Sequence, residues 1–137
     1  MSSKDNNLIE KFKIALTSTA KVISDDLELY KLSEKQSKKN DSIEINDLVK
    51  PSDFIKLRAE TDSAALKKKF SNNDIYKKNL PSNTSSKSLY NIAEKIRYES
   101  LGGKMLKGIK KNFNENYKQI INRTQKDQLR NKEDVSI

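Results

Sequence analysis

The sequence predicts a mainly α-helical domain that carries one minor β-hairpin. Three segments repeat apolar side chains at intervals of three and four residues, which is the period of one helical face. Two short segments between the first and second of them alternate apolar with polar residues, and a proline stands where the second helix would begin. Because 34% of the residues are hydrophobic, against about 45–50% in typical domains, the core must be concentrated in these segments.

Residues 7–23 are expected to form the first helix. Its apolar or small residues share one face: Leu8, Phe12, Ala15, Leu16, Thr19, Ala20 and Ile23. Apolar and polar side chains then alternate at about residues 27–32 and 42–46, and the residues between them are polar and turn-prone. These two segments predict a small hairpin with an exposed loop.

The second helix is expected over residues 51–70. Pro51 favours the first helical turn, and Ser52 and Asp53 supply a capping oxygen or a negative charge at the positive end of the helix dipole. The side that faces inward is predicted to carry Phe54, Leu57, Thr61, Ala64 or Ala65, and the aliphatic stem of Lys68. Residues 71–86 are rich in asparagine, serine and proline, and they predict a loop.

The longest helical pattern extends from Ser88 to Ile121. Its inward stripe consists of Leu89, Ile92, Ala93, Ile96, Ser100, Gly103, Leu106, Ile109 or Lys110, Phe113, Tyr117 and Ile120. Two adjacent glycines, Gly102 and Gly103, each cost a helix about 1 kcal/mol relative to alanine. Either the helix breaks there or the glycines let another part of the chain approach closely, and the unbroken phase of the stripe favours close packing.

These patterns divide the chain into three parts. Residues 1–6 are expected to form a flexible N-terminus, residues 7–123 a helical domain, and residues 124–137 a polar tail. No apolar run reaches the ~18 residues that would span a bilayer, and the N-terminus has no apolar signal core, so we expect a cytoplasmic protein without a membrane partner.

The net charge of +9 is compatible with nucleic-acid binding, which is the alternative function that the composition leaves open. However, 28 residues are basic and only four of them are arginine, the residue whose planar guanidinium suits bidentate recognition of phosphate and guanine. A lysine stripe along one face would support a small basic nucleic-acid-binding protein, whereas an even scatter around an apolar or glycine-rich patch would support a protein-binding module. We prefer the second interpretation.

The sequence offers few residues that could catalyse a reaction. The chain has no cysteine and no histidine, which excludes thiol nucleophiles, zinc fingers and imidazole acid–base catalysis. The sequence Gly103-Lys104-Met105 lacks the upstream glycine and the hydroxyl residue of a phosphate-binding loop, and Asp134-Val-Ser136 only begins an Asp-x-Ser-x-Ser cation motif. We therefore expect no catalytic residue, metal site or cofactor site in this chain.

Four charged residues lie within the apolar helical patterns: Arg58, Asp62, Arg97 and Glu99. They form either a cluster for binding or catalysis, or an interhelical ion-pair network between the second helix and the long helix. The ion-pair interpretation is preferred, because nothing else about the four residues indicates chemistry.

Several segments resemble the cobaltochelatase CobT subunit. The segment 94–113 shares a skeleton with that family, carried here by Arg97, Glu99, Gly102, Gly108, Ile109, Lys111, Asn112 and Phe113. The segment 57–66, with Arg58 and Asp62, resembles the family's Arg-x-x-x-Asp helix, and Leu80-Pro81 resembles the loop after it. The segment 12–16 matches its opening helix, so that the resemblance covers about residues 8–120 in the same order.

This resemblance implies a subunit that works with an AAA+ ATPase subunit and a large chelatase subunit to insert cobalt into a corrin-type ring in aerobic cobalamin biosynthesis. In that family a von Willebrand-type metal-binding domain lies further toward the C-terminus. We therefore expect residues 124–137 to lead to a missing C-terminal region, and this chain to be an assembly module of a multi-subunit ligase rather than its catalytic part. The possible interface residues are Arg58, Asp62, Arg97, Glu99, Gly102, Gly103, Gly108 and Asn112.

Overall fold

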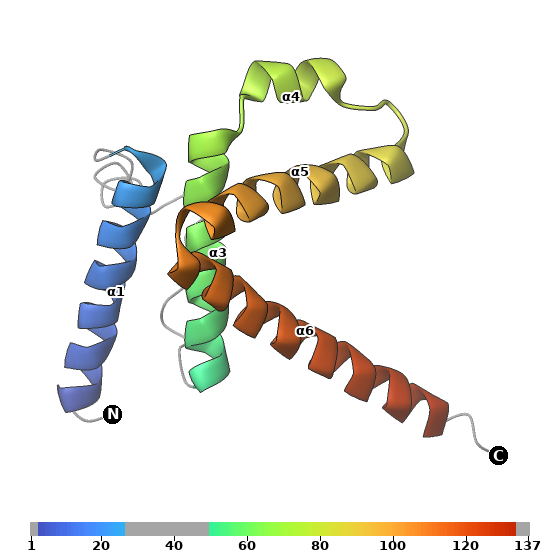
Figure 1. The fold of residues 1–137 in the computed structure, drawn as a ribbon. Coiled ribbons are helices and arrows are strands. Elements are labelled where there is room, and N and C mark those ends of the chain that lie inside the picture. Colours follow the sequence, from blue (N-terminus) through green and yellow to red (C-terminus); the bar gives the residue numbers. More distant parts are fainter. Residues whose placement is uncertain (1–2, 27–49, 134–137) are drawn as a thin grey trace.

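The structure is a computed structural model that describes residues 3–26 and 50–133. Its helices are α1 (Ser3–Ser24), α3 (Pro51–Phe70), α4 (Asn73–Asn79), α5 (Thr84–Met105) and α6 (Lys107–Glu133) (Figure 1). The mainly helical fold is thus confirmed, and no strand occurs within these ranges. The predicted hairpin at residues 27–32 and 42–46 lies outside the described residues.

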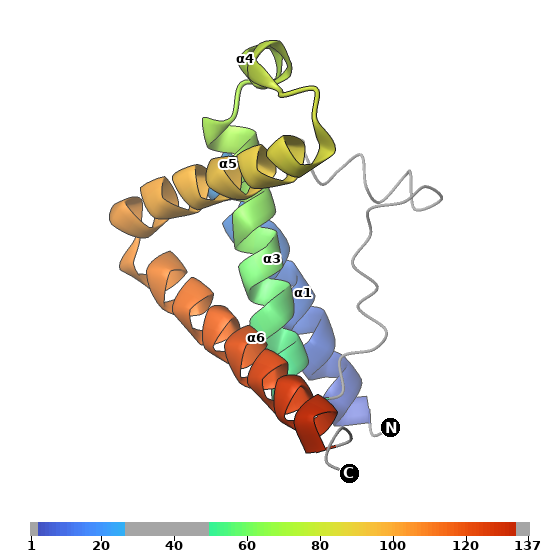
Figure 2. The ribbon, with the colours of Figure 1, turned by 90° about the vertical axis from the view of Figure 1, so that its right-hand side faces the viewer.

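The central helix is α3, which contacts α1 on one side and both α5 and α6 on others. The first two helices, α1 and α3, lie side by side, while α5 and α6 diverge from a shared corner (Figure 1). Viewed from the side, α3, α5 and α6 form a triangle (Figure 2). The divergence leaves the facing sides of α5 and α6 only partly covered.

The helix α3 is buried on more than one of its faces. Its buried residues are Leu57, Ala59, Thr61, Asp62, Ser63, Ala65 and Leu66. Leu57, Thr61 and Ala65 were predicted to face inward, whereas Ala64 and Lys68 are exposed. Most of the other buried side chains are small or polar, and they are buried because three helices, rather than one, pack around α3.

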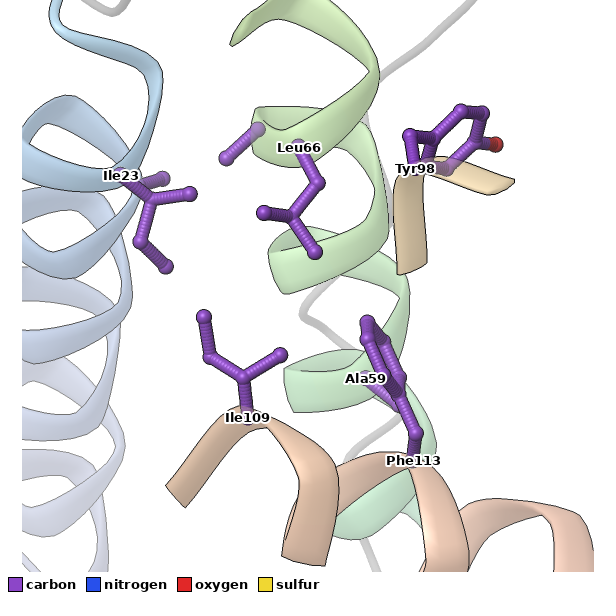
Figure 3. Close-up of a cluster of buried hydrophobic side chains, with 8 residues drawn as sticks. Ile23, Ala59, Leu66, Tyr98, Ile109 and Phe113 are labelled. Carbon is purple, nitrogen blue, oxygen red and sulfur yellow. The ribbon is translucent and has the colours of Figure 1, made fainter. Parts of the chain in front are cut away.

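One main hydrophobic cluster joins all the long helices. Its buried members come from α1, α3, α5 and α6: Ala20, Ile23, Ala59, Ala65, Leu66, Tyr98, Ile109 and Phe113 (Figure 3). A smaller cluster pairs Leu16 with Leu57 and extends to Phe12 and Phe54, whose rings meet edge to face with centroids 5.0 Å apart.

Asparagine caps account for two differences from the sequence prediction. The side chain of Asn72 accepts hydrogen bonds from the backbone N–H groups of Asp74 and Ile75, at 3.0 and 3.1 Å, and thereby starts α4 within the segment predicted as a loop. The side chain of Asn83 caps α5 in the same way, so that this helix begins at Thr84 rather than near Ser88.

The prediction of one continuous helix from Ser88 to Ile121 is wrong. Leu106 adopts an extended backbone conformation, with φ −137° and ψ 118°, and separates α5 from α6. The break falls after the two glycines, and it lets each helix pack against α3 in its own direction. At its C-terminal end, α6 continues as a helix to Glu133, beyond the point where the polar tail was expected to begin.

The close packing expected at the glycines occurs at Gly102. A Cβ atom added there would lie 2.9 Å from Cγ of Leu66 and closer still to its two methyl carbons. Leu66 is fully buried, so it has little room to move away. Gly102 therefore permits the contact between α5 and α3.

In the described part of the chain no helix is long and apolar enough to cross a membrane.

We predict that Gly102→Ala lowers the free energy of unfolding by about 1–3 kcal/mol, because the added methyl group overpacks the contact with Leu66. Chemical denaturation measures this change. Gly108→Ala is the matched control, since nothing lies within 4 Å of the position of its Cβ and alanine favours a helix. Equal stability of the two variants would contradict close packing at Gly102.

Candidate functional site

Asp62 is the most deeply buried of the charged residues that the sequence singled out. It lies on α3 with 1% of its surface exposed, and Asn112 on α6 donates a hydrogen bond from Nδ2 to Asp62 Oδ2 at 2.8 Å. Burial raises the pKa of the Asp62 carboxyl, while the bond from Asn112 and the positive charge of Arg58 act in the opposite direction. This pair connects α3 to α6.

Glu99 connects three helices through a pair of short hydrogen bonds. From α5 its carboxylate accepts a bond from the Ser63 hydroxyl on α3 and another from the Tyr117 hydroxyl on α6, both at 2.6 Å. Burial and the bond to Glu99 raise the pKa of Tyr117 well above its usual value. Lys95 lies one turn away, with its Nζ 3.8 Å from Glu99.

Arg97 pairs with neither of the two buried acids, and its acidic partner, Glu94, is on its own helix. Its guanidinium donates two bonds of 2.8 Å to Glu94 and a third, of 2.7 Å, to the carbonyl oxygen of Phe70 at the end of α3. The same carboxylate accepts a bond from the hydroxyl of Ser71 at 2.7 Å. Chiefly through the bonds from Arg97, the pKa of Glu94 falls to about 2.

The expected interhelical ion-pair network is therefore replaced by hydrogen bonds to uncharged partners. The ion pairs of the described residues include none between either arginine and Asp62 or Glu99. Asn112, Ser63 and Tyr117 supply the bonds instead. Neutral partners satisfy a buried carboxylate without the cost of burying a second charge.

The remaining motif residues lie nearer the surface. Arg58 is exposed beside a small hollow that Phe12, Phe54 and Asn112 also line. Gly108 is exposed at the start of α6, and Gly103 is half-buried at the corner between α5 and α6. The structure thus brings Asp62, Glu99, Gly102 and Asn112 into the helix contacts and leaves Arg58 and Gly108 outside them.

A groove lies between α5 and α6 beside this corner. Its volume is about 450 Å³, and its lining comprises Ile96, Glu99, Ser100, Gly103, Lys104, Lys110, Phe113, Asn114 and Tyr117. Along α5 an apolar stripe leads away from the groove through Ile96, Ile92 and Leu89, which are 57%, 57% and 69% exposed. The sequence placed these three residues in the core, and they are exposed because α6 diverges from α5.

The acidic group that lines the groove is engaged in hydrogen bonds within the protein. Its carboxylate belongs to Glu99, and both oxygens of that group accept hydrogen bonds from the protein. Within residues 3–26 and 50–133 no three acidic side chains come together in a way that could hold a metal ion. The sequence signal for this surface was the apolar spacing of α5, which placed these residues on one helical face but could not reveal whether a neighbouring helix would cover that face.

We predict that Tyr117→Phe destabilises the protein by about 1–3 kcal/mol, because Glu99 Oε2 loses its donor in a buried setting. Thermal or chemical unfolding measures the change. Tyr76→Phe is the control: its hydroxyl bonds to Asn91 at an exposed site, so the loss should be within about 0.5 kcal/mol. If the two substitutions cost the same, the Glu99 connection does not stabilise the fold.

We also predict that the stabilisation provided by Glu94 depends on pH. Its folded pKa of about 2 lies below the usual 4.5, so the unfolded chain binds the proton more readily. The contribution is complete above about pH 4.5 and is lost as the pH falls toward 2. The free-energy difference between the wild type and Glu94→Gln should therefore shrink over this range.

Unfolding titrations at several pH values test this prediction. Glu60→Gln serves as the control, since Glu60 makes an exposed pair with Lys56 at 3.8 Å and its replacement should change stability little at any pH. A constant difference between the wild type and Glu94→Gln from neutral to acidic pH would rule out the Arg97–Glu94 pair as the cause.

Comparison with known proteins adds one finding to this geometry. No curated protein and no solved structure matches the chain significantly. A family model described as cobalamin biosynthesis protein CobT matches residues 6–137, which include α3, α4, α5 and α6 and nearly all of α1. Because this match covers almost the whole sequence, the chain belongs to the CobT family of cobalamin biosynthesis proteins.

Proposed function

We propose that this chain is a non-catalytic, partner-binding module of an ATP-dependent cobaltochelatase. In this role it binds the AAA+ ATPase subunit and the large chelatase subunit of the assembly that inserts cobalt into a corrin-type ring during cobalamin biosynthesis. The observation that carries the proposal is the match of residues 6–137 to the CobT family.

The use of the polar side chains supports a non-catalytic role. A general acid or base must be free to exchange a proton with a substrate. Asp62 and Glu99 are instead bound to Asn112, Ser63 and Tyr117 within the helix contacts. The sequence also offers no histidine or cysteine for acid–base or nucleophilic chemistry.

The exposed apolar residues support a partner-binding role. Single exposed apolar side chains are ordinary on protein surfaces, but a continuous row beside a groove is typical of an interaction site. Leu89, Ile92 and Ile96 form such a row along α5 and lead to the groove at the corner with α6. A helical module with this surface is suited to docking against another subunit.

We predict that the immobilised chain retains the purified AAA+ subunit of a cobaltochelatase, in the presence of ATP, at concentrations where an unrelated helical protein of equal net charge does not. The matched charge is necessary because an excess of nine positive charges attracts many proteins without specificity. Surface plasmon resonance measures the difference, and the isolated chain should hydrolyse no ATP.

Two outcomes would count against this function. If the chain binds the AAA+ subunit no better than the charge-matched control with ATP and with ADP, the assembly role loses its support. Sequence-selective binding of duplex DNA at physiological salt would favour the nucleic-acid alternative instead.

A further inference from the structure

The facing sides of α5 and α6 present apolar side chains that no described helix covers. On α5 these are Leu89, Ile92 and Ile96, spaced by three and four residues. On α6, Tyr117 lines the groove, and Ile120 and Ile121 follow one turn later, 47% and 54% exposed. The two rows diverge from the corner where α5 meets α6 (Figures 1 and 2).

The dimensions of this surface fit one helix. From Leu89 to Gly103 the stripe runs about 21 Å at the rise of an α-helix, which corresponds to four turns of a helical partner. Near the corner, Ser100 presents a small, exposed side chain, so a partner helix could approach the backbone of α5 there, whereas the space over Gly103 is filled by Lys110 of α6. Phe113 and Tyr117 provide an apolar floor at the same place.

The charges around the groove favour an occupant with acidic side chains. Lys104 and Lys110 line it, and neither takes part in an ion pair with the described residues. Lys95 lies at the same opening, with its Nζ 6.0 Å from the centre of the Tyr117 ring. The carboxylate of Glu99 is buried and hydrogen-bonded, so the accessible charge of the groove is positive.

We propose that the α5–α6 groove binds an acidic amphipathic helix of a partner protein. The apolar face of that helix packs on Leu89, Ile92, Ile96 and Tyr117, and its carboxylates lie beside Lys104 and Lys110. This inference rests on the proposed function in one respect, namely that the occupant belongs to another subunit.

Charge disfavours a second copy of this chain as the occupant. The long helix α6 carries eight basic and three acidic residues, so docking α6 of one copy into the groove of another would place lysines against lysines. Duplex DNA is disfavoured as well, because the row of leucine and isoleucine side chains offers nothing to the phosphate backbone.

A pair of synthetic helical peptides tests the proposal. Each has about 18 residues with leucines at three- and four-residue spacing, and the remaining positions are mainly glutamate in one peptide and lysine in the other. Fluorescence anisotropy with the full chain should show at least about tenfold tighter binding of the glutamate peptide, and added salt should weaken that binding.

Substitutions on the groove locate the binding surface. Ile92→Asn combined with Ile96→Asn should weaken binding of the glutamate peptide by at least about tenfold, because both side chains are exposed apolar anchors. Lys104→Gln combined with Lys110→Gln should remove most of the preference for the glutamate peptide. The matched controls lie on α4: Ile75→Asn, and Lys77→Gln combined with Lys78→Gln, which should leave binding unchanged.

A photo-crosslinking residue gives a readout that does not depend on weakened binding. Placed at position 92, it should form an adduct with the glutamate peptide, and placed at position 75 it should not. All substituted positions are exposed, and circular dichroism checks that each variant keeps its helices.

Three results would overturn the inference. The first is equal affinity for the two peptides, and the second is binding that the groove variants leave unchanged. The third is dimerisation of the chain that the Ile92 and Ile96 substitutions abolish, because a second copy would then occupy the groove.

The experiments distinguish a failure of the groove inference from a failure of the proposed function. If the AAA+ subunit binds the groove variants as well as the wild type, and the peptides show no preference, the groove inference is wrong while the assembly role stands. If the AAA+ subunit does not bind at all but the glutamate peptide does, the groove inference stands and the assembly role is wrong.

Discussion

The architecture depends on the burial of α3 by three neighbouring helices at once. Small side chains on such a helix let its neighbours approach closely, because the distance between two packed helices depends on the side chains at their contact. Its buried surface accordingly includes Ala59, Ala65 and the polar side chains of Asp62 and Ser63. Buried polar groups require hydrogen-bond partners, and Asp62 and Ser63 find theirs on adjacent helices in Asn112 and Glu99. Packing and hydrogen bonding together fix where α5 and α6 cross α3.

The divergence of α5 and α6 follows from that arrangement. The two helices meet at Leu106, contact α3 at different levels, and separate as they leave the corner (Figure 2). The bonds from Arg97 to Glu94 and to the carbonyl oxygen of Phe70 hold α5 to the end of α3. The residues that share the family pattern therefore mostly position the helices, and the apolar groove is a consequence of the angle that they set.

The sequence predicted the helices well where a period or a proline marked them, as from Pro51 to Phe70. It also indicated that Gly102 allows a close contact, although it could not name Leu66 as the neighbour. The failures concern α4 and the break at Leu106, since a short helix depends on a cap at Asn72 and a break depends on where α3 lies. The interhelical ion-pair network was likewise wrong, because the exposed Arg58 keeps its hydration while the buried Asp62 takes a neutral partner, Asn112.

By itself, the sequence determined the helical class, the approximate positions of α1 and α3 and the kinship with the CobT family, because these depend on local periodicity and on residue order. Tertiary structure alone decided which apolar faces are covered. Ile96 and Phe113 belong to the same predicted stripe, yet Phe113 is buried against α3 while Ile96 is 57% exposed. The reason is geometric: helical spacing aligns side chains on one face, but only the angle between α5 and α6 determines how far along that face a neighbour remains within reach.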